Sequence, residues 1–564
     1  MTLTRNKQGD GDDAPDLSHF RRRYPLTVAS LGALPDREAW LRRVWLAESR
    51  WRDALDDKSM RESIVRAAPP ARLTFEGQCE IVYAGASGLL HAAVMACCHD
   101  RRVVVFDERT EADGGRIWNV SAEELEGLAR AGLFTKEEIE ATIINRFRAG
   151  RVKFHDAGSR LKAPPLEVKG VLDAALDADR LLAVAALKIK AREGCVVVEG
   201  ARVVRVYVER HRVSVEFENA RGARALYAAR LFVDTRGAAS GVAQQLNEGQ
   251  AFTHVAPTVG TLARGFARGV ESDRVDFQIA DLMMSTEDSS RHRQLLWGGF
   301  GRDARREEFT SQLFFYDAVD SPADKSLLAL FEQYFEKLPA YKRAGAHWRV
   351  VRPVFGYNAS RAMGGWRSRA PRSEDRVLLA HDGSTRANPF APTGAGAALR
   401  DLRKSTHLTE LALVADLLDA ASLSEIASES PRAAHAAQLA EFLRPTTSER
   451  EEPANVNETL NAVMAALHEL DERVRRELFQ DRLSFGALRS LLSRTVQLYP
   501  RILQRVREHL GARGTFLWLA HAAGVALSER RGEHDEERPA GTVDLNAEKA
   551  AREFARHVEL YRKS

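Results

Sequence analysis

One segment, residues 79–109, constrains the fold of this 564-residue chain more than any other. Two short, mostly apolar runs, Glu80–Tyr83 and Val103–Phe106, flank a stretch, Leu89–Cys98, whose composition suits a helix. Apolar runs of this length are typical of strands that are buried on both faces of a parallel sheet. The order strand, turn, helix, strand therefore predicts a βαβ unit within an α/β fold.

The turn after the first strand carries the second and third glycines of a G-x-G-x-x-G pattern, Gly85 and Gly88, while Tyr83 replaces the first. Such glycines let a pyrophosphate approach the free N–H groups at a helix N-terminus. Asp107 and Glu108 end the second strand, where an acid can accept both hydroxyls of an adenosine ribose. We therefore predict a dinucleotide site at these residues. Whether the side chain of Tyr83 crowds the loop is a question that the sequence leaves open.

Overall charge and cysteine usage argue against several classes of protein. The chain has 83 basic and 79 acidic side chains and a net charge of +4, which is no signature of nucleic-acid binding. Residues 1–15 do not have the pattern of a signal peptide, and no apolar run reaches the ~18 residues that span a bilayer. The chain has four cysteines, Cys79, Cys97, Cys98 and Cys195, and their spacing does not match that of zinc ligands. We therefore predict buried thiols in a cytoplasmic protein, with no metal site. The sequence offers no basis for an oligomeric state.

Changes in composition divide the chain into parts. Residues 1–15 are polar and are expected to be disordered. Residues 16–75 are expected to form an N-terminal helical extension, in which three tryptophans favour helix packing over membrane contact. Period-two alternation in 260–349 predicts an antiparallel sheet that faces the substrate. The nucleotide-binding domain is expected at 76–259 and 350–410, and a helical region at 411–564.

Two later segments resemble the remaining cofactor contacts of flavin enzymes. A buried strand, Leu231–Val233, runs into Asp234 of a D-x-x-G step. A second buried strand leads to Asp382, placed as the aspartate that holds the ribityl chain of FAD, although His381 stands where a glycine usually precedes it. A helix expected from about Ala395 would direct its N-terminus at the pyrimidine end of the flavin. The predicted cofactor is FAD, and four further residues are predicted to bind it: Asp234, Asp382, Gly394 and Gly396.

Taken in order, these elements resemble the flavin-dependent oxidoreductases that include aromatic hydroxylases, geranylgeranyl reductases and lycopene cyclases. Residues 116–140, 259–266, 294–341 and 352–361 look like the CruA/CruP family of lycopene cyclases and cyclase-like proteins. The likeness spans roughly residues 40–410, and its most specific block is 294–341. It implies a two-dinucleotide-binding, hydroxylase-like FAD domain and an apolar, carotenoid-like substrate.

The resemblance also implies a chemistry, in which an acid protonates a terminal double bond and reduced flavin assists ring closure. A proton donor of this kind needs a raised pKa in an apolar pocket. We predict Glu287 as this acid, with Glu308 as the next candidate. Carboxylates at such positions more often have a surface or structural role. Aromatic side chains that could line a polyene channel are Trp118, Trp297, Phe314, Phe315 and Tyr316.

Two other functions stay open. A redox flavoprotein, a monooxygenase or a reductase, could modify another apolar metabolite. A chain that keeps the fold without the cofactor could act as a binding or scaffolding partner, and the altered loops at Tyr83 and His381 favour that alternative. Near the C-terminus, arginines in Leu491–Leu510 precede the apolar run Gly514–Leu527, which predicts either a helical cap or peripheral contact with a membrane.

Overall fold

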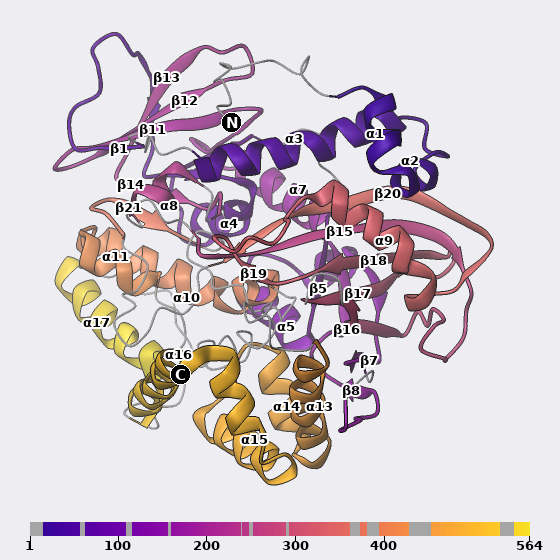
Figure 1. Ribbon diagram of the computed structural model, residues 1–564. Helices are drawn as coiled ribbons and strands as arrows, with labels where there is room; N and C mark the ends of the chain where they lie inside the picture. Colours follow the sequence, from indigo (N-terminus) through magenta and orange to yellow (C-terminus); the bar gives the residue numbers. More distant parts are fainter. Residues whose placement is uncertain are drawn as a thin grey trace.

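The computed structural model describes residues 15–56, 63–108, 116–155, 159–237, 240–246, 252–288, 293–360, 373–380, 394–427, 453–530 and 546–563. The disorder that we expected at residues 1–15 falls almost wholly outside this range. Four sheets and a set of covering helices build the part of the chain that the structure describes (Figure 1).

A five-stranded parallel sheet forms the centre of the nucleotide-binding region, in the order β10-β4-β3-β14-β21. Its strands are β10 (Val196–Glu199), β4 (Val103–Asp107), β3 (Ile81–Ala84), β14 (Leu231–Asp234) and β21 (Val377–Leu379). The predicted βαβ unit is confirmed, because β3 and β4 are parallel neighbours in the sheet and α4 (Leu89–Cys98) connects them. The fold class is α/β, as predicted.

Alternate residues of these strands are buried on opposite faces of the sheet. Ile81, Tyr83 and Val105 pack against helices on one face, whereas Val82 and Val104 pack against a second sheet on the other. The helices of the first face are α4, α7 (Ala178–Lys190), α10 (Gly394–Ala415) and α17 (Ala547–Lys563). The second sheet consists of β1 (Ile64–Val65), β11 (Arg202–Val208), β12 (Val213–Glu218), β13 (Arg224–Ala229) and β2 (Phe75–Gln78).

The large, mainly antiparallel sheet extends beyond the residues 260–349 that we predicted for it. Its strand β15 (His254–Phe266) begins earlier, and β20 (Ala344–Ser360), which pairs with β15, carries residues 350–360 that we had placed in the nucleotide-binding domain. The other strands are β7 (Ala149–Lys153), β8 (Leu166–Val168), β16 (Ile279–Asp288), β17 (Arg293–Asp303), β18 (Glu308–Phe314) and β19 (Asp317–Ala318). The difference arises because backbone pairing brings distant segments into one sheet.

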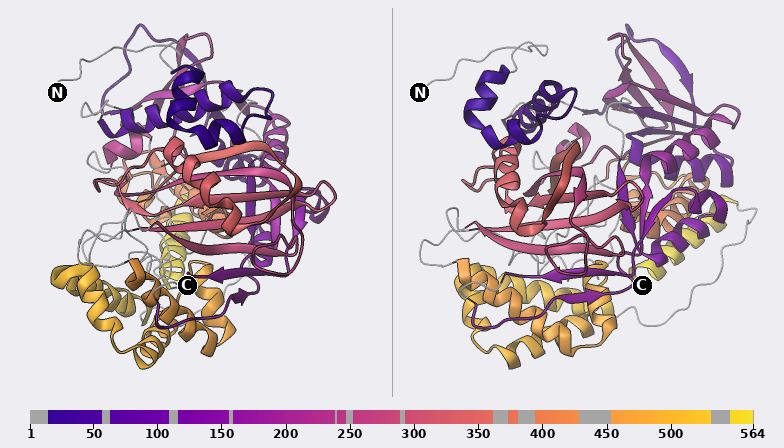
Figure 2. Two further views of the ribbon diagram at one scale, coloured as in Figure 1. Left: turned by 45° about the vertical axis from the view of Figure 1, so that its right-hand side comes forward. Right: turned by 90° about the vertical axis from the view of Figure 1, so that its right-hand side faces the viewer.

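Helices cover both faces of this large sheet (Figure 2). One face is covered by α1 (Leu17–Arg23), α2 (Pro25–Ser30), α3 (Arg37–Asp56) and α9 (Leu327–Tyr341). Trp51 of α3 stacks on Tyr357 of β20, with ring centroids 4.5 Å apart. The other face is covered by α13 (Pro453–Glu469), α14 (Glu472–Phe479) and α15 (Phe485–Leu498). Among the described residues, no helix is long and apolar enough to span a membrane.

A small three-stranded sheet joins the two larger regions. It consists of β5 (Ile117–Val120), β9 (Ala174–Asp177) and β6 (Ile143–Arg146). The helix that follows β5, α5 (Ala122–Arg130), begins with the capping box that the sequence predicts, in which the Ser121 hydroxyl accepts from the Glu124 backbone N–H and the Glu124 carboxylate accepts from the Ser121 N–H. Because β5 lies beside α10, its first residues face the carboxyl edge of the parallel sheet.

Candidate functional site

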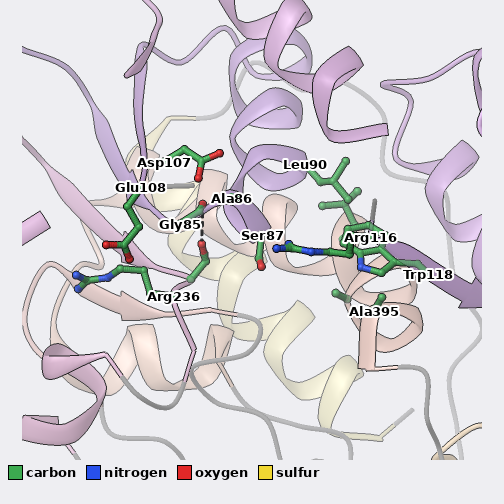
Figure 3. A pocket seen from close by; sticks show the side chains of 13 residues that line it. Gly85, Ala86, Ser87, Leu90, Asp107, Glu108, Arg116, Trp118, Arg236 and Ala395 are labelled. Atoms are coloured by element: carbon green, nitrogen blue, oxygen red, sulfur yellow. Dashed lines mark hydrogen bonds between the residues drawn. The ribbon is translucent and has the colours of Figure 1, made fainter. Parts of the chain in front are cut away.

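A cavity of about 390 Å³ lies at the carboxyl edge of the parallel sheet (Figure 3). This is the edge where ligands bind in open α/β sheets. Five separate segments contribute to it: the turn after β3, the end of β4, the residues after β14, the start of β5 and the first turns of α10. The residues that line it are Gly85, Ala86, Ser87, Leu90, Asp107, Glu108, Arg116, Trp118, Thr235, Arg236, Ala395, Ala398 and Leu402.

The glycine turn adopts a conformation that requires its glycines. Gly85 has a φ of 101°, which side chains rarely tolerate, and a 3-10 turn, η2 (Ala86–Gly88), leads into α4. A β-carbon on Gly85 would lie 3.1 Å from Cγ of Arg236, and one on Gly88 would lie 3.0 Å from Oγ1 of Thr235. The absence of side chains at these glycines thus lets Thr235 and Arg236, which follow β14, pack closely against the turn. It also leaves the N-terminal end of α4 open to the cavity.

The ring of Tyr83 does not enter this cavity. Tyr83 is fully buried within β3, and its hydroxyl lies 2.8 Å from Nδ1 of His91 on α4. The ring packs beneath the turn, and Tyr83 is absent from the residues that line the cavity. The crowding of the loop that we left open is therefore not observed.

Acidic side chains line one end of the cavity, where β4 ends. Asp107 is almost fully buried and Glu108 is exposed, and both contribute to the cavity wall. Figure 3 shows Glu108 beside Arg236, on the side of the turn opposite to Arg116. This end of the cavity can accept hydrogen bonds from a ligand, as a ribose requires.

Asp234 has a different position from the one expected for a cofactor contact. It is almost fully buried, and its carboxylate binds the Arg236 guanidinium through Nη2 at 2.8 Å and Nε at 3.0 Å, and the Ser240 hydroxyl at 2.8 Å. Burial lowers the pKa of Arg236, but Asp234 outweighs it and holds that pKa above the ordinary value. Asp234 thus orients Arg236, which lines the cavity and which our sequence reasoning missed; the D-x-R spacing was the available signal.

A second arginine, which directly precedes β5, and a tryptophan of β5 also line the cavity. The backbone N–H of Arg116 donates to Oδ2 of Asp179 at 2.9 Å, and Figure 3 shows its side chain reaching towards Ser87 of the turn. Trp118 also lines the cavity. By contrast, Trp297 stacks on Tyr341 at 4.5 Å within the core beneath α9. The aromatic residues that we considered for one polyene channel therefore lie in separate clusters.

The first turn of α10 forms the end of the cavity near Arg116. The helix begins at Gly394, close to the predicted start, and Ala395 lines the cavity. Gly396 does not: a β-carbon there would collide with the carboxylate of Glu124, which is ion-paired to Arg400. Asp382 and the loop that contains it lie outside the described residues, so its role stays a prediction.

Of the two predicted acids, Glu308 has a described side chain, and it is not part of this cavity. Glu308 of β18 is buried and ion-paired to Arg264 of β15, with Arg302 of β17 at 3.9 Å. It joins three strands of the large sheet, and it does not line the cavity. Glu287 lies opposite Gln294 on the neighbouring strand, and its side chain is outside the described residues.

Comparisons with known proteins define the class of fold. The halogenase PltM superposes with a TM-score of 0.50 at 14% identity, covering 79% of this chain and 97% of PltM. Two others have slightly lower TM-scores. A geranylgeranyl bacteriochlorophyll reductase-like protein from Thermoplasma acidophilum has a TM-score of 0.49 at 13% identity, covering 77% of this chain and 99% of that protein. The anhydrotetracycline hydroxylase OxyS from Streptomyces rimosus has a TM-score of 0.47 at 17% identity, covering 73% of this chain and 75% of OxyS. No protein-family model matches the chain, and no curated protein matches its sequence.

The chain therefore shares the α/β fold of the halogenase PltM, and the α/β class is the one that the sequence predicts. At these identities the likeness shows the fold alone, and no family model supports the CruA/CruP resemblance.

Proposed function

We propose that the cavity binds FAD and that the chain is a flavin-dependent oxidoreductase acting on an apolar metabolite. One observation carries the proposal: three features predicted separately, the glycine turn, Asp107 and the start of α10, line a single cavity. Its volume of about 390 Å³ lies within the range of ~300–1,000 Å³ that is typical of small-molecule sites. PltM, which shares the fold, has been crystallised with FAD.

The residues of the cavity fit the parts of this cofactor. The carboxylate of Asp107 can accept hydrogen bonds from a ribose. The turn brings the N-terminal end of α4 to the cavity, and Arg116 offers a guanidinium, so that both suit a pyrophosphate. The N–H of Gly85 itself donates to the carbonyl of Phe106 at 2.9 Å. The positive end of the α10 dipole favours the electron-rich pyrimidine edge. When bound, FAD would supply redox chemistry, and the chain would bind and orient it.

Cyclisation of a carotenoid-like substrate is the second candidate. It is favoured by the resemblance of residues 116–140, 259–266 and 294–341 to the lycopene cyclases of the CruA/CruP type. The position of Glu308 counts against it, because that carboxylate is held by arginines away from the cavity. Consumption of NAD(P)H and oxygen during turnover would support a redox enzyme, whereas isomerisation of a polyene without net redox change would support a cyclase.

A scaffold without cofactor loses part of its support, since Tyr83 leaves the cavity open. The absorption spectrum of the purified protein tests the proposal directly. We expect flavin bands in the near-ultraviolet and blue and release of FAD on denaturation. A colourless protein that cannot be reconstituted with FAD would overturn the proposal.

A matched pair of variants locates the site. Asp107→Asn should reduce FAD retention, because it removes a charged acceptor from the cavity. Glu199→Gln is the control: Glu199 pairs in register with Asp107 on β10, but it is exposed and binds Lys190. Equal loss of FAD in both variants would contradict this placement.

A further inference from the structure

Exposed apolar side chains gather on one helix, α16 (Ile502–Arg530). Nine large apolar side chains are exposed among the described residues, and three of them belong to α16: Leu503, Phe516 and Leu519, with 62%, 70% and 56% of their surface exposed. Contiguous exposed apolar side chains mark a surface that interacts with a partner, and Phe516 and Leu519 lie three residues apart on the same helical segment.

A break at Gly511 separates the packed first part of α16 from the described side chains that follow it. Before the break, Ile502, Val506 and Leu510 recur at helical spacing and pack against the C-terminal helices. Gly511 has a φ of 68° and a ψ of 171°, so the helix changes direction there. After it, Arg513, Phe516 and Leu519 follow at intervals of three residues and are all exposed. The exposed side chains of Arg513, Phe516 and Leu519 thus form a mixed cationic and apolar ridge after the break.

The same region carries an excess of positive charge. Residues 485–520 contain six arginines and one glutamate, a net charge of +5. Arg507 and Arg513 of α16 are exposed, and so is Arg501, which directly precedes the helix. Figures 1 and 2 show α13–α16 at the end of the molecule opposite to α1–α3.

We propose that α16 is a docking site for an anionic lipid surface. Arginines attract the acidic headgroups, and Phe516 and Leu519 enter the boundary between headgroups and acyl chains, the arrangement of interfacial helices. A nucleic acid would use the arginines and leave the apolar side chains in water. The helix lies on the surface and does not cross the bilayer. The proposal is independent of whether FAD is bound.

Co-flotation of the purified full-length protein with vesicles tests this docking site. We expect binding to vesicles of phosphatidylcholine mixed with phosphatidylglycerol, little binding to phosphatidylcholine alone, and weaker binding at high salt. The double variant Phe516→Ser, Leu519→Ser should lower partitioning about tenfold or more, because both apolar contacts are lost. The triple variant Arg501→Gln, Arg507→Gln, Arg513→Gln should abolish the preference for anionic vesicles.

Leu187→Ser provides the control, because Leu187 on α7 is similarly exposed, at 66%, and lies on a different part of the molecule. Leu187→Ser should bind vesicles as the wild type does. Circular dichroism of each variant would check that the variant is folded. Three results would overturn the proposal: no flotation of the wild type with anionic vesicles, equal loss in Leu187→Ser, or a concentration-dependent dimer without vesicle binding that Phe516→Ser, Leu519→Ser abolishes. The flavin spectrum of the same samples reports on the proposed function separately.

Discussion

The hydroxyl of Tyr83 and Nδ1 of His91 lie 2.8 Å apart in the interior, directly beneath the glycine turn. His91 continues the contact through Nε2, 3.4 Å from Oγ1 of Thr409 on α10. The tyrosine that replaces the first glycine of the motif thereby links β3, α4 and α10, which are the elements that carry the cavity. Burial raises the pKa of Tyr83 well above its ordinary value, so that the hydroxyl stays protonated.

Replacing Tyr83 should weaken the fold without improving the cavity. Tyr83→Phe leaves His91 without this partner and should cost about 1–3 kcal/mol in the free energy of unfolding. Tyr83→Gly also removes the ring from the core and should cost about 3–5 kcal/mol. Urea unfolding measures both effects. If Tyr83→Gly bound FAD more tightly than the wild type, the position of the ring outside the cavity would be contradicted.

Gly396→Ala should destabilise the start of α10, because the added methyl collides with the carboxylate of Glu124. Overpacking of this kind costs about 1–3 kcal/mol. Gly486→Ala is the control, since a β-carbon at that helical glycine meets no atom within 4 Å. Thermal unfolding of the two variants compares them. Similar midpoints for Gly396→Ala and the wild type would count against the contact with Glu124.

A buried ion-pair network in the large sheet should dominate its stability. Asp281 of β16 contacts Nζ of Lys342 and Nη2 of Arg151 at 2.7 Å each, and accepts from the Tyr341 hydroxyl at 2.8 Å. Burial raises the pKa of Asp281, but the two cations outweigh it and hold that pKa below the ordinary value. Asp281→Asn leaves buried charges uncompensated and should cost about 3–5 kcal/mol.

Asp273→Asn is the control for this network, because Asp273 pairs with Arg343 at a more exposed position. Exposed pairs contribute about 0–1 kcal/mol, so chemical unfolding should separate the two variants clearly. Equal destabilisation would show that Asp281 has no special role.

Stability should depend on pH through His407, where α10 meets α17. The rings of His407 and His557 lie 4.8 Å apart. Burial lowers the pKa of His407 from 6.5 to about 4. The nearby His557, His99 and Arg403 lower it further, and Glu553 opposes them. Between these values the unfolded chain binds the proton more tightly, so stability falls as the pH decreases from 6.5 to 4. At pH 5 the loss should be about 2 kcal/mol relative to pH 8.

Unfolding in urea at pH 8 and pH 5 measures this loss for the wild type and for His407→Gln. The variant should lose about 2 kcal/mol less than the wild type on acidification, because its side chain does not titrate. An identical pH dependence in both proteins would exclude His407 as the responsible group.

Several features of the fold follow from local sequence. The strand, turn and helix at residues 79–109, the capping box of Ser121 and Glu124, and the start of α10 all form as predicted. Each depends on backbone conformation or on contacts between residues a few positions apart. Asp107 reaches the cavity for the same reason, since its place at the end of β4 is a matter of spacing along the strand.

Only the tertiary structure decided which partner each functional side chain has. Asp234 is occupied by Arg236 and Ser240, Gly396 accommodates Glu124 from a helix far away in the sequence, and Glu308 pairs with arginines of other strands. Sequence by itself determined the order of the elements and the edge of the sheet where a nucleotide can bind. It could not determine these contacts, because packing between distant segments, and the cost of leaving a buried charge unpaired, select the partners after the elements have formed.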